Sequence, residues 1–435
     1  MFRYILCILA ILLVSPISLA NSDDRYNDSV VTLFNKAAEK HKGKFESLME
    51  MRGRNIKDNT ASLSNVLYAL SRYEQRTTML FYDQEGKTLR IWAISNFGNV
   101  QLKEIQISKE ELEEKIYGFR RSINTLGFQM ERSAKPKRGV VIANSKEAKA
   151  TGLQEISQLL LPNEFHGTVR YTENLLIVPT LGIGSVPFAL LKFTGRARDQ
   201  LIDSVSITVL PSLFDTDNAL PFRTINAPSI PKALIVGNPS FSNDPDWDFP
   251  QLPGAEKEAK IVSEYFKSVP LIGKDATKWH VLKEIELVDV IYFATHGVAS
   301  VHSPLEESFI ALSGSNKIDS RLTAREIQSL SLQAKLVVLS ACQTGLGKVD
   351  EAGIIGLARA FKIAGADEVV VSLWNVDDQV TTELMTSFMK RYLNSTNHAS
   401  NALKAAMLEI KEKYIEPRLW APFIVFSGKG TIIEY

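Results

Sequence analysis

The sequence predicts an α/β protein built on a mostly parallel sheet that is flanked by helices. The first observation is a set of short apolar runs, of which VDVIYFATHG (288–297) and AKLVVLSACQTGLG (334–347) are the clearest. Continuous apolar runs of this kind are typical of strands that are buried on both faces. The second observation is that helix-length segments separate these runs, as crossovers between parallel strands require.

The alternation of strands and helices is most regular beyond residue 230. Pro253 opens one expected helix, at a position where its missing N–H costs nothing. Thr323-x-x-Glu326 is a capping box for another, and SFIALSG (308–314) resembles one arm of a hairpin. Strands are expected in ALIVGNP (233–239), SVPLIG (268–273), the two runs above, DEVVVSLW (367–374) and APFIVFSG (421–428), and helices in 253–266, 277–285, 353–365, 378–393 and 399–413.

The chain before residue 230 divides into a helical lead-in, residues 21–75, and a second α/β unit, residues 76–225. Three strands with period-two patterning are expected in 78–83, 88–95 and 100–107, followed by a helix that Ser108 and Glu111 cap. Residues 126–150 are polar and basic and are expected to form a loop. A helix in 153–161 and strands in 174–180 and 203–211 complete the unit, and NAPSIPK (226–232) reads as a linker to the unit 230–435.

Residues 1–20 have the three parts of a secretory signal peptide. Arg3 supplies the positive start, Tyr4 to Val14 the apolar core, and Ser18-Leu19-Ala20 the small residues before the cleavage site. The core is too short to span a bilayer. We therefore expect a secreted or periplasmic protein that starts near Asn21 and keeps no membrane span.

Composition and motifs exclude several classes of function. The chain has 50 basic and 49 acidic residues and a net charge of +1, so nothing indicates a nucleic-acid partner. No phosphate-binding glycine motif follows a strand, and no cofactor is expected. His296, His302 and Cys342 lack a suitably spaced fourth ligand for zinc, so no metal is expected. The sequence gives no prediction of oligomeric state.

The chemistry-bearing residues are one cysteine and one histidine, each at the end of a buried strand. Cys342 ends the strand in 334–342, and His296 ends the strand in 288–297. Adjacent parallel strands lie about 5 Å apart, and ligands collect at their carboxyl ends. A thiol and an imidazole are the parts of a cysteine nucleophile and its acid–base partner. The amides of Gly297 and Cys342 are candidate oxyanion donors. Residue pattern alone leaves open whether the pair is catalytic or structural.

The two runs, together with GIIGLARAFKIAGADEVVVSLWNVDD (353–378), resemble the CHAT family of caspase-like cysteine peptidases. Further matches are LLIVPTLGIGSVPFALL, VLPS, ALIVGNP, LPGAEKEA and WAPFIVFSG. The resemblance covers residues 76–435 and implies a caspase–hemoglobinase fold with His296 and Cys342 as the catalytic dyad. It also implies that the unit 76–225 is a degenerate caspase-like unit without catalytic residues. The chain departs from many family members in lacking tetratricopeptide repeats and in having a signal peptide.

Three residues near the end of the strand in 367–374 are candidates for substrate binding. Asp377 and Asp378 precede a helix, where they can cap it or pair with a basic substrate residue. Trp374 can be core or pocket rim. No Arg or Lys lies near Cys342 before Lys348, which favours a basic residue over an acidic one at the cut.

The expected function is that of a secreted cysteine endopeptidase whose Cys342 thiolate attacks a peptide carbonyl of a protein substrate. His296 would handle the proton that goes to the leaving amine. The alternative is a catalytically silent module that keeps the fold as a scaffold for interactions.

Overall fold

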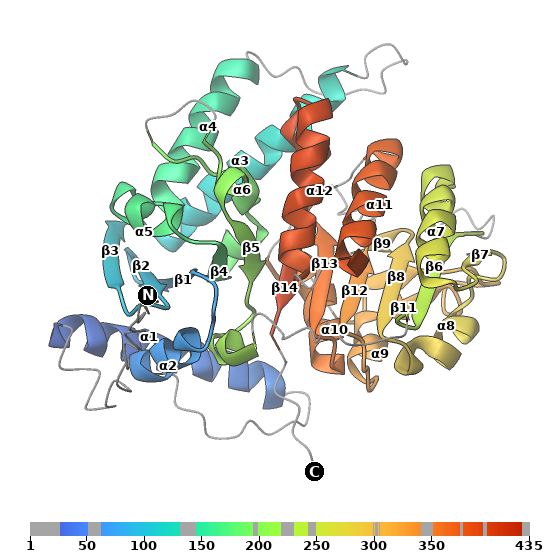
Figure 1. Cartoon of the computed structure of the whole chain (residues 1–435), viewed down its shortest axis with the longest axis horizontal. Coiled ribbons are helices and arrows are strands. Elements are labelled where there is room, and N and C mark those ends of the chain that lie inside the picture. The colour runs from blue at the N-terminus through green and yellow to red at the C-terminus, as the bar shows by residue number, and fades with distance from the viewer. Residues whose placement is uncertain are drawn as a thin grey trace, which may run out of the picture.

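The computed structural model places the expected strands in two sheets (Figure 1). Structural statements below concern the residues that the structure describes, which are 27–50, 62–130, 145–194, 199–218, 230–241, 249–298, 300, 303, 305–340, 351–374, 377–394 and 398–428. The expected signal peptide, His302 and Cys342 lie outside these residues. The strands of the small sheet, in spatial order, are β11 (Arg321–Thr323), β10 (Phe309–Ala311) and β9 (Gly297–Val298).

The large sheet is 11-stranded within the described residues. Its neighbours β1–β2, β2–β3 and β13–β14 pair antiparallel, and all its other neighbours pair parallel. The predicted fold class, mixed α/β on a mostly parallel sheet, is therefore confirmed. The strands in spatial order are β3 (Val100–Gln106), β2 (Thr88–Ser95), β1 (Thr77–Glu85), β4 (Asn174–Val178), β5 (Ser206–Val209), β14 (Phe423–Ser427), β13 (Glu368–Ser372), β12 (Leu336–Leu339), β8 (Val290–Ala294), β6 (Ala233–Pro239) and β7 (Leu271–Gly273).

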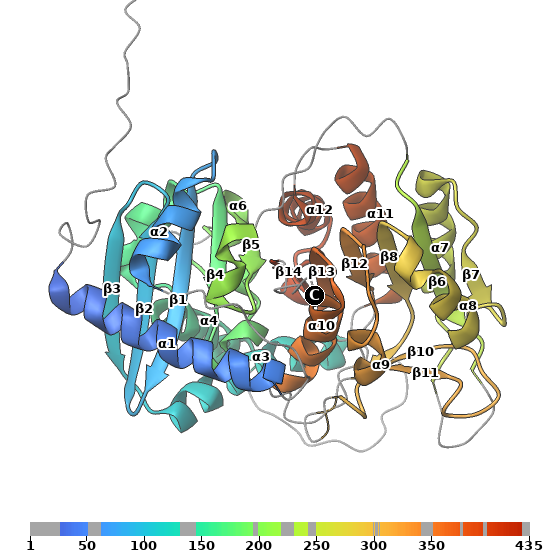
Figure 2. The ribbon, with the colours of Figure 1, turned by 90° about the horizontal axis from the view of Figure 1, so that it is seen from below.

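Helices cover both faces of the large sheet, as right-handed crossovers require. The α-helices are α1 (Asp28–Glu50), α2 (Leu63–Ser71), α3 (Lys109–Met130), α4 (Ser145–Leu160), α5 (His166–Arg170), α6 (Leu201–Ser204), α7 (Pro253–Phe266), α8 (Lys278–Glu284), α9 (Ala324–Gln328), α10 (Glu351–Ala364), α11 (Asp378–Asn394), α12 (Ala399–Lys413) and α13 (Pro417–Trp420). Figure 2 shows α7, α11 and α12 on one side of strands β14 to β6, and α8, α9 and α10 on the other. Short 3-10 helices occupy 163–165, 181–185, 188–190, 213–218 and 285–287.

The alternation of side chains along β1 assigns its two faces to different helices. Met79 and Phe81 are buried in the cluster that α1 and α2 close. Leu80 and Tyr82 point to the other face and join the cluster that includes residues of α3 and α4. The Tyr82 hydroxyl donates to the carbonyl of Leu160, 2.7 Å away, so its polar end is satisfied in the core. Both faces of β1 are thus covered, which is the physical cause of its continuous apolar run from Met79 to Tyr82.

One sequence-based expectation is wrong. Residues 126–150 were expected to form a loop because they are polar and basic, but α3 continues to Met130 and α4 begins at Ser145. Residues 131–144 lie outside the described part of the chain. Long polar side chains are good helix formers, so a polar composition does not by itself exclude a helix.

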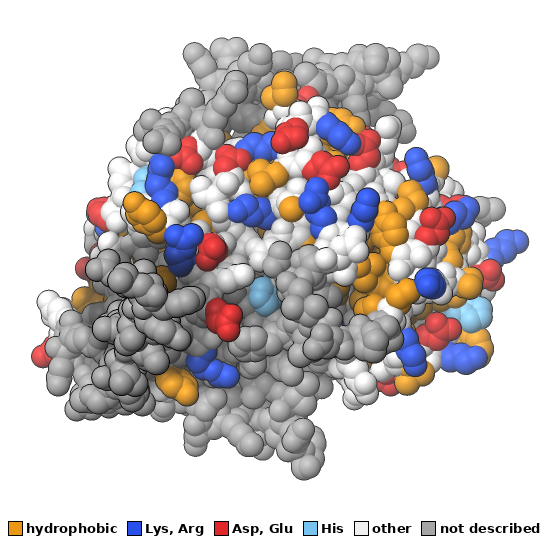
Figure 3. Space-filling model, in the orientation of Figure 1, with side chains coloured by type: hydrophobic (Ala, Val, Ile, Leu, Met, Phe, Trp, Pro, Cys, Tyr) orange, Lys and Arg blue, Asp and Glu red, His pale blue; other side chains and the backbone are white. Residues whose placement is uncertain are grey.

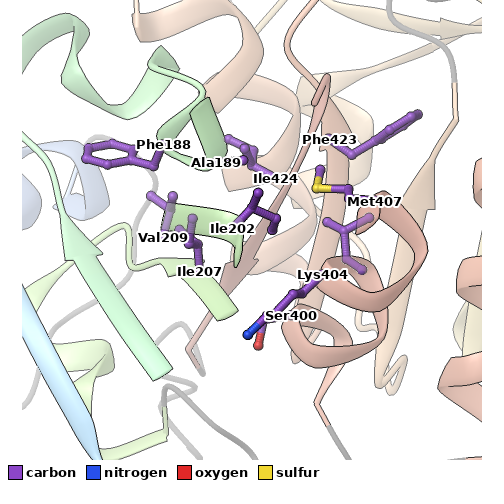
Figure 4. Close-up of a pocket in the computed structure, with 11 residues that line it drawn as sticks. Phe188, Ala189, Ile202, Ile207, Val209, Ser400, Lys404, Met407, Phe423 and Ile424 are labelled. Carbon is purple, nitrogen blue, oxygen red and sulfur yellow. The ribbon is translucent and has the colours of Figure 1, made fainter. Parts of the chain in front are cut away.

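The boundary between the units 76–225 and 230–435 does not interrupt the large sheet. Strand β5 of the first unit pairs parallel with β14 of the second, with Thr208 opposite Val425 and Val209 opposite Phe426. Beside this pair of strands lies an apolar pocket, lined among others by Ile207, Met407 and Ile424 (Figure 4). The two units are thus joined by paired strands, and the division into two domains stays a prediction.

Candidate active site

The carboxyl ends of β8 and β12 form the centre of the candidate site. These strands are parallel neighbours, with Phe293 opposite Leu339, and the Ser340 amide continues the ladder by donating to the Phe293 carbonyl at 2.8 Å. His296 lies three residues beyond Phe293, and Cys342 lies three residues beyond Leu339. The strands therefore deliver the chain to equivalent points of the same sheet edge. His296 is described there, whereas Cys342 lies outside the described residues.

The imidazole of His296 is buried and enclosed by aromatic rings. Only 2% of the residue is exposed. The ring of Phe249 stacks on it with centroids 5.0 Å apart and an interplanar angle of 25°, and Phe241 lies at 5.5 Å. On the backbone side, the His296 carbonyl accepts from the Ala311 amide at 2.8 Å, which ties the residue to β10. These contacts restrict the ring to one orientation.

One hydrogen bond fixes the tautomer of His296. Its Nε2 lies 2.8 Å from the backbone carbonyl of Pro250. A carbonyl oxygen can only accept, so Nε2 carries the proton and Nδ1 of the neutral ring is the free base. This partner was missed in the sequence because any residue type can supply a backbone carbonyl, and no side-chain motif indicates it.

The surroundings hold the pKa of His296 below its ordinary value. Burial lowers the pKa because it penalises the imidazolium, while the Pro250 carbonyl and the charge of Asp378 act in the opposite direction. The net direction keeps the ring neutral at pH 7, which is the state in which it can accept a proton.

The two aspartates that were predicted to bind substrate both accept backbone hydrogen bonds. Asp377 caps α11, because its Oδ1 accepts from the Val380 amide at 3.0 Å, and the residue is exposed. The carboxylate of Asp378 instead accepts from Gly254 at 2.6 Å and Ala255 at 3.1 Å, the first turn of α7. Their contact with substrate stays a prediction.

Trp374, the third predicted substrate contact, lies just past the end of β13 and is 3% exposed. Its indole N–H donates to the carbonyl of Arg418 at 3.0 Å, and its ring belongs to the main hydrophobic core. Both contacts are those of a core residue, and a role at a pocket rim stays a prediction.

The predicted oxyanion donor Gly297 opens β9. It lies opposite Ile310, while the neighbouring bond from Ala311 to His296 marks the adjacent pair as the hydrogen-bonded one. Hydrogen-bonded and non-hydrogen-bonded pairs alternate in an antiparallel ladder, so the Gly297 N–H points away from β10. That amide is therefore not used by the small sheet. The second predicted donor, the Cys342 amide, lies outside the described residues.

Beneath the site, Glu258 of α7 is fully buried against two strands. The Tyr292 hydroxyl of β8 donates to Glu258 Oε1 at 2.7 Å. Burial raises the pKa of Glu258 to about 8, the Ser340 and Tyr292 hydroxyls lower it, and the charge of Asp378 raises it. Glu258 is thus a neutral acid at pH 7, and it ties α7 to the strand that carries His296. An acidic residue inside an amphipathic helix is typical of a solvent-facing position, so no sequence pattern indicates that Glu258 is buried.

Metal ligands, membrane-spanning helices and surface charge were compared with the described structure. Within them, no group of three or more His, Cys, Asp and Glu is arranged to hold a metal ion. Likewise none of the helices in the described residues is long and apolar enough to cross a membrane. On the face shown in Figure 3, side chains of both charge signs are interspersed.

The chain belongs to the CHAT-domain family. The family's model matches residues 133–429, which include the strands β8, β12 and β13 and every predicted site residue. The resemblance that the sequence motifs indicated is therefore confirmed, and the caspase-like assignment made from the same motifs is consistent with this family.

Similar curated proteins are the human and mouse proteins named tetratricopeptide repeat protein 28. The human protein is 29% identical over 304 residues, and the mouse protein 28% over 303. Each alignment covers 60% of this chain but only 12% of the relative, so the chain spans about an eighth of their length.

Two solved structures are similar at low identity. The Arg-specific cysteine proteinase gingipain R is 12% identical with a TM-score of 0.39, and the match covers 66% of this chain and 69% of that one. Separase in its complex with securin, from Saccharomyces cerevisiae, is 12% identical with a TM-score of 0.42, and the match covers 84% of this chain and 31% of that one.

Proposed function

We propose that this CHAT-domain protein is a cysteine endopeptidase that uses Cys342 as nucleophile and His296 as its acid–base partner. The observation that carries the proposal is the hydrogen bond from His296 Nε2 to the Pro250 carbonyl. It leaves the basic Nδ1 on a ring that is buried, oriented and neutral, at the sheet edge where β12 ends, three residues before Cys342 in the sequence.

In the proposed reaction, His296 takes the proton of the Cys342 thiol at Nδ1, and the thiolate attacks the scissile carbonyl and forms a tetrahedral intermediate. The amides of Gly297 and Cys342 stabilise its oxyanion. His296 donates a proton to the leaving amine, which departs and leaves a thioester on Cys342. Water then attacks the thioester with His296 as base, and the acid product and free thiol are released.

The proposed substrate is a protein segment with a basic residue before the cut. The exposed Asp377 supports this preference, because its Oδ1 accepts only one backbone amide among the described contacts. A carboxylate so placed can form a charge-assisted hydrogen bond with Lys or Arg.

We also propose that the protein is exported and that its signal peptide is cleaved after Ala20. N-terminal sequencing of natively expressed protein tests this proposal. An intact Met1 on protein from the cytoplasm would overturn it.

The second candidate is a catalytically silent module that uses the fold for interactions. The observation that favours it is the burial of His296, which is 2% exposed beneath Phe249 and Phe241. A peptide library incubated with the purified protein separates the two. Cleavage after Lys or Arg that disappears in Cys342→Ala supports the peptidase. Binding of peptides without cleavage supports the silent module.

A further inference from the structure

The segment that supplies the Pro250 carbonyl is held at alternate residues. The carbonyl of Pro250 accepts from His296, the amide of Leu252 donates to Asn238 Oδ1 at 2.7 Å, and the amide of Gly254 donates to Asp378 at 2.6 Å. The segment 250–254 is therefore held by two side-chain acceptors, Asn238 and Asp378, and it contacts His296 at its Pro250 end. The position of the Pro250 carbonyl depends on both acceptors.

Helix α7 has no cap of its own. Its N-cap residue is Leu252, whose side chain accepts no hydrogen bond, and Pro253 follows at the first helical position. The carboxylate of Asp378, from the first turn of α11, takes the place of the missing cap by accepting from Gly254 and Ala255. A carboxylate at this point also complements the positive end of the α7 dipole. The Thr382 hydroxyl adds a second tie by donating to the Gly254 carbonyl at 3.1 Å.

Residue 254 must be glycine for this contact. A Cβ at position 254 would lie 2.4 Å from Cγ of Asp378 and 2.5 Å from its Oδ2, well inside the distance that real Cβ atoms keep. The backbone of α7 and the Asp378 carboxylate are thus so close that only glycine at position 254 leaves room for the contact. The contact is a close fit between two elements that are more than 100 residues apart in the sequence.

We propose that Asp378 is a positioning residue for His296, which holds the start of α7 and thereby the Pro250 carbonyl against the Nε2 of the ring. The inference rests on the proposed function for its catalytic meaning, though the positioning itself can be tested without substrate. It gives Asp378 a role beside its predicted contact with substrate, because both of its carboxylate oxygens accept amides of the first turn of α7.

The proposed contact also fixes the direction in which Asp378 changes the pKa of His296. The charge of Asp378 raises the pKa of His296, against the larger effect of burial. The other groups that face the ring in the described structure are uncharged: Phe241, Phe249 and the Pro250 carbonyl. Glu258 and Tyr292, which hydrogen-bond to each other, are both neutral at pH 7. Removal of the Asp378 charge should therefore lower the pKa of His296 further.

The test is an NMR titration of protein labelled with ¹⁵N and ¹³C histidine, with the His296 signals assigned by their loss in His296→Gln. In Asp378→Asn we expect a lower titration midpoint for His296 and a loss of the Nε2–H tautomer in favour of Nδ1–H. Asp377→Asn is the matched control for these two signals, because it removes a neighbouring carboxylate that caps α11 instead of α7. An unchanged midpoint and tautomer in Asp378→Asn would overturn the inference.

Gly254→Ala separates geometry from charge. Its Cβ displaces the Asp378 carboxylate without removing the side chain, so we expect the Nε2–H signal of His296 to weaken although the aspartate is still present. If Asp378→Asn does not fold, Gly254→Ala decides by the same tautomer criterion. If the protein cleaves no peptide while both variants shift the His296 signals, the positioning role stands and the proposed function falls. If it cleaves peptides and the His296 signals do not move in either variant, the proposed function stands and the positioning role falls.

For an active enzyme, the pH profile gives an independent readout. Asp378→Asn should lower kcat/KM by about 10²-fold, since misplacing a catalytic group by about 1 Å costs this much. The acidic limb of the profile should also move to lower pH. A lower rate with an unmoved limb would show a purely structural effect and would contradict the positioning role.

Discussion

His296 shows how a single backbone carbonyl can set the tautomer of a buried histidine. Its ring is buried, stacked on Phe249 and protonated at Nε2 because Pro250 offers only an acceptor. Burial lowers its pKa, so the neutral form prevails at pH 7. Such a ring can act as a base for a nucleophile that lies at Nδ1, and Cys342 is the nucleophile that we propose.

Replacement of either member of the dyad should remove most of the peptidase activity. Cys342→Ala and His296→Ala each disable the same step, so the double variant should be little worse than either single one. Steady-state cleavage of the best library peptide measures this, with circular dichroism as the control for folding. Losses that multiply in the double variant would show that the two residues act separately.

Glu258 should make the stability of the protein depend on pH. Its pKa is raised from 4.5 to about 8 in the folded state, so the folded form binds a proton that the unfolded form releases. The stabilisation is complete below about pH 4.5 and is lost as pH rises through 8, on the order of a few kcal/mol. Glu258→Gln keeps an acceptor for Tyr292 and should flatten this dependence.

Chemical denaturation at pH 5 and pH 8.5 checks the expectation for Glu258. The free energy of unfolding of the native sequence should fall between the two pH values, and that of Glu258→Gln should fall clearly less. Equal falls in both proteins would show that Glu258 is ionised in the folded state.

At the scale of elements, helix starts decide where the site residues lie. Asp377 caps α11, and Asp378 in the first turn of α11 caps α7. Two adjacent residues thus fix the starts of two packed helices at the carboxyl edge of the sheet. Thr323 and Glu326 form the expected capping box of α9, with the Glu326 amide donating to Thr323 Oγ1 at 3.2 Å.

Loss of the α11 cap should lower stability and alter substrate choice. Asp377→Ala removes the acceptor of the Val380 amide and should cost about 1 kcal/mol of unfolding free energy. Asp377→Ser keeps the cap without the charge, so it should retain stability while losing the preference for Lys or Arg at the cut. Urea denaturation measures the change in unfolding free energy, and cleavage of the peptide library measures the preference at the cut. A retained basic preference in Asp377→Ser would remove Asp377 from the substrate site.

The sequence predicted most elements because their signals are local. Pro253 opens α7 and the apolar run of β8 is a strand, both as expected. Three features were not predictable. The role of Asp378 depends on a helix more than 100 residues away, the partner of His296 is a backbone carbonyl, and Glu258 is buried although its residue type favours solvent.

At the scale of the whole molecule, the two predicted units share one sheet. The pairing of β5 with β14 joins segments about 200 residues apart, a contact that no local pattern reveals. Side chains cross the same junction. Arg120 of α3 donates to the Leu373 carbonyl at the end of β13 at 3.1 Å, and Lys404 of α12 donates to the Ser204 carbonyl at 2.7 Å. The first unit thus contacts the strand that ends beside the candidate site.

The unit 230–435 should therefore not be stable alone. Its isolation exposes the edge of β14 that β5 covers, and an exposed apolar edge strand promotes aggregation. We expect the isolated unit to be aggregated or largely unfolded, as measured by size-exclusion chromatography and thermal unfolding. A soluble monomer as stable as the full chain would show that the two units are independent domains.

The most direct test of the proposed dyad is the rate at which Cys342 reacts with iodoacetamide across pH, followed by mass spectrometry of the peptide that contains it. Cys342 and Cys7 are the two cysteines of the chain, and their peptides are distinct. A free thiol has a pKa of about 8.5. We predict that Cys342 reacts well below that pH in the native protein, and that His296→Ala shifts its reaction up to the free-thiol range. An inert Cys342, or a pH dependence that His296→Ala leaves unchanged, would contradict the dyad.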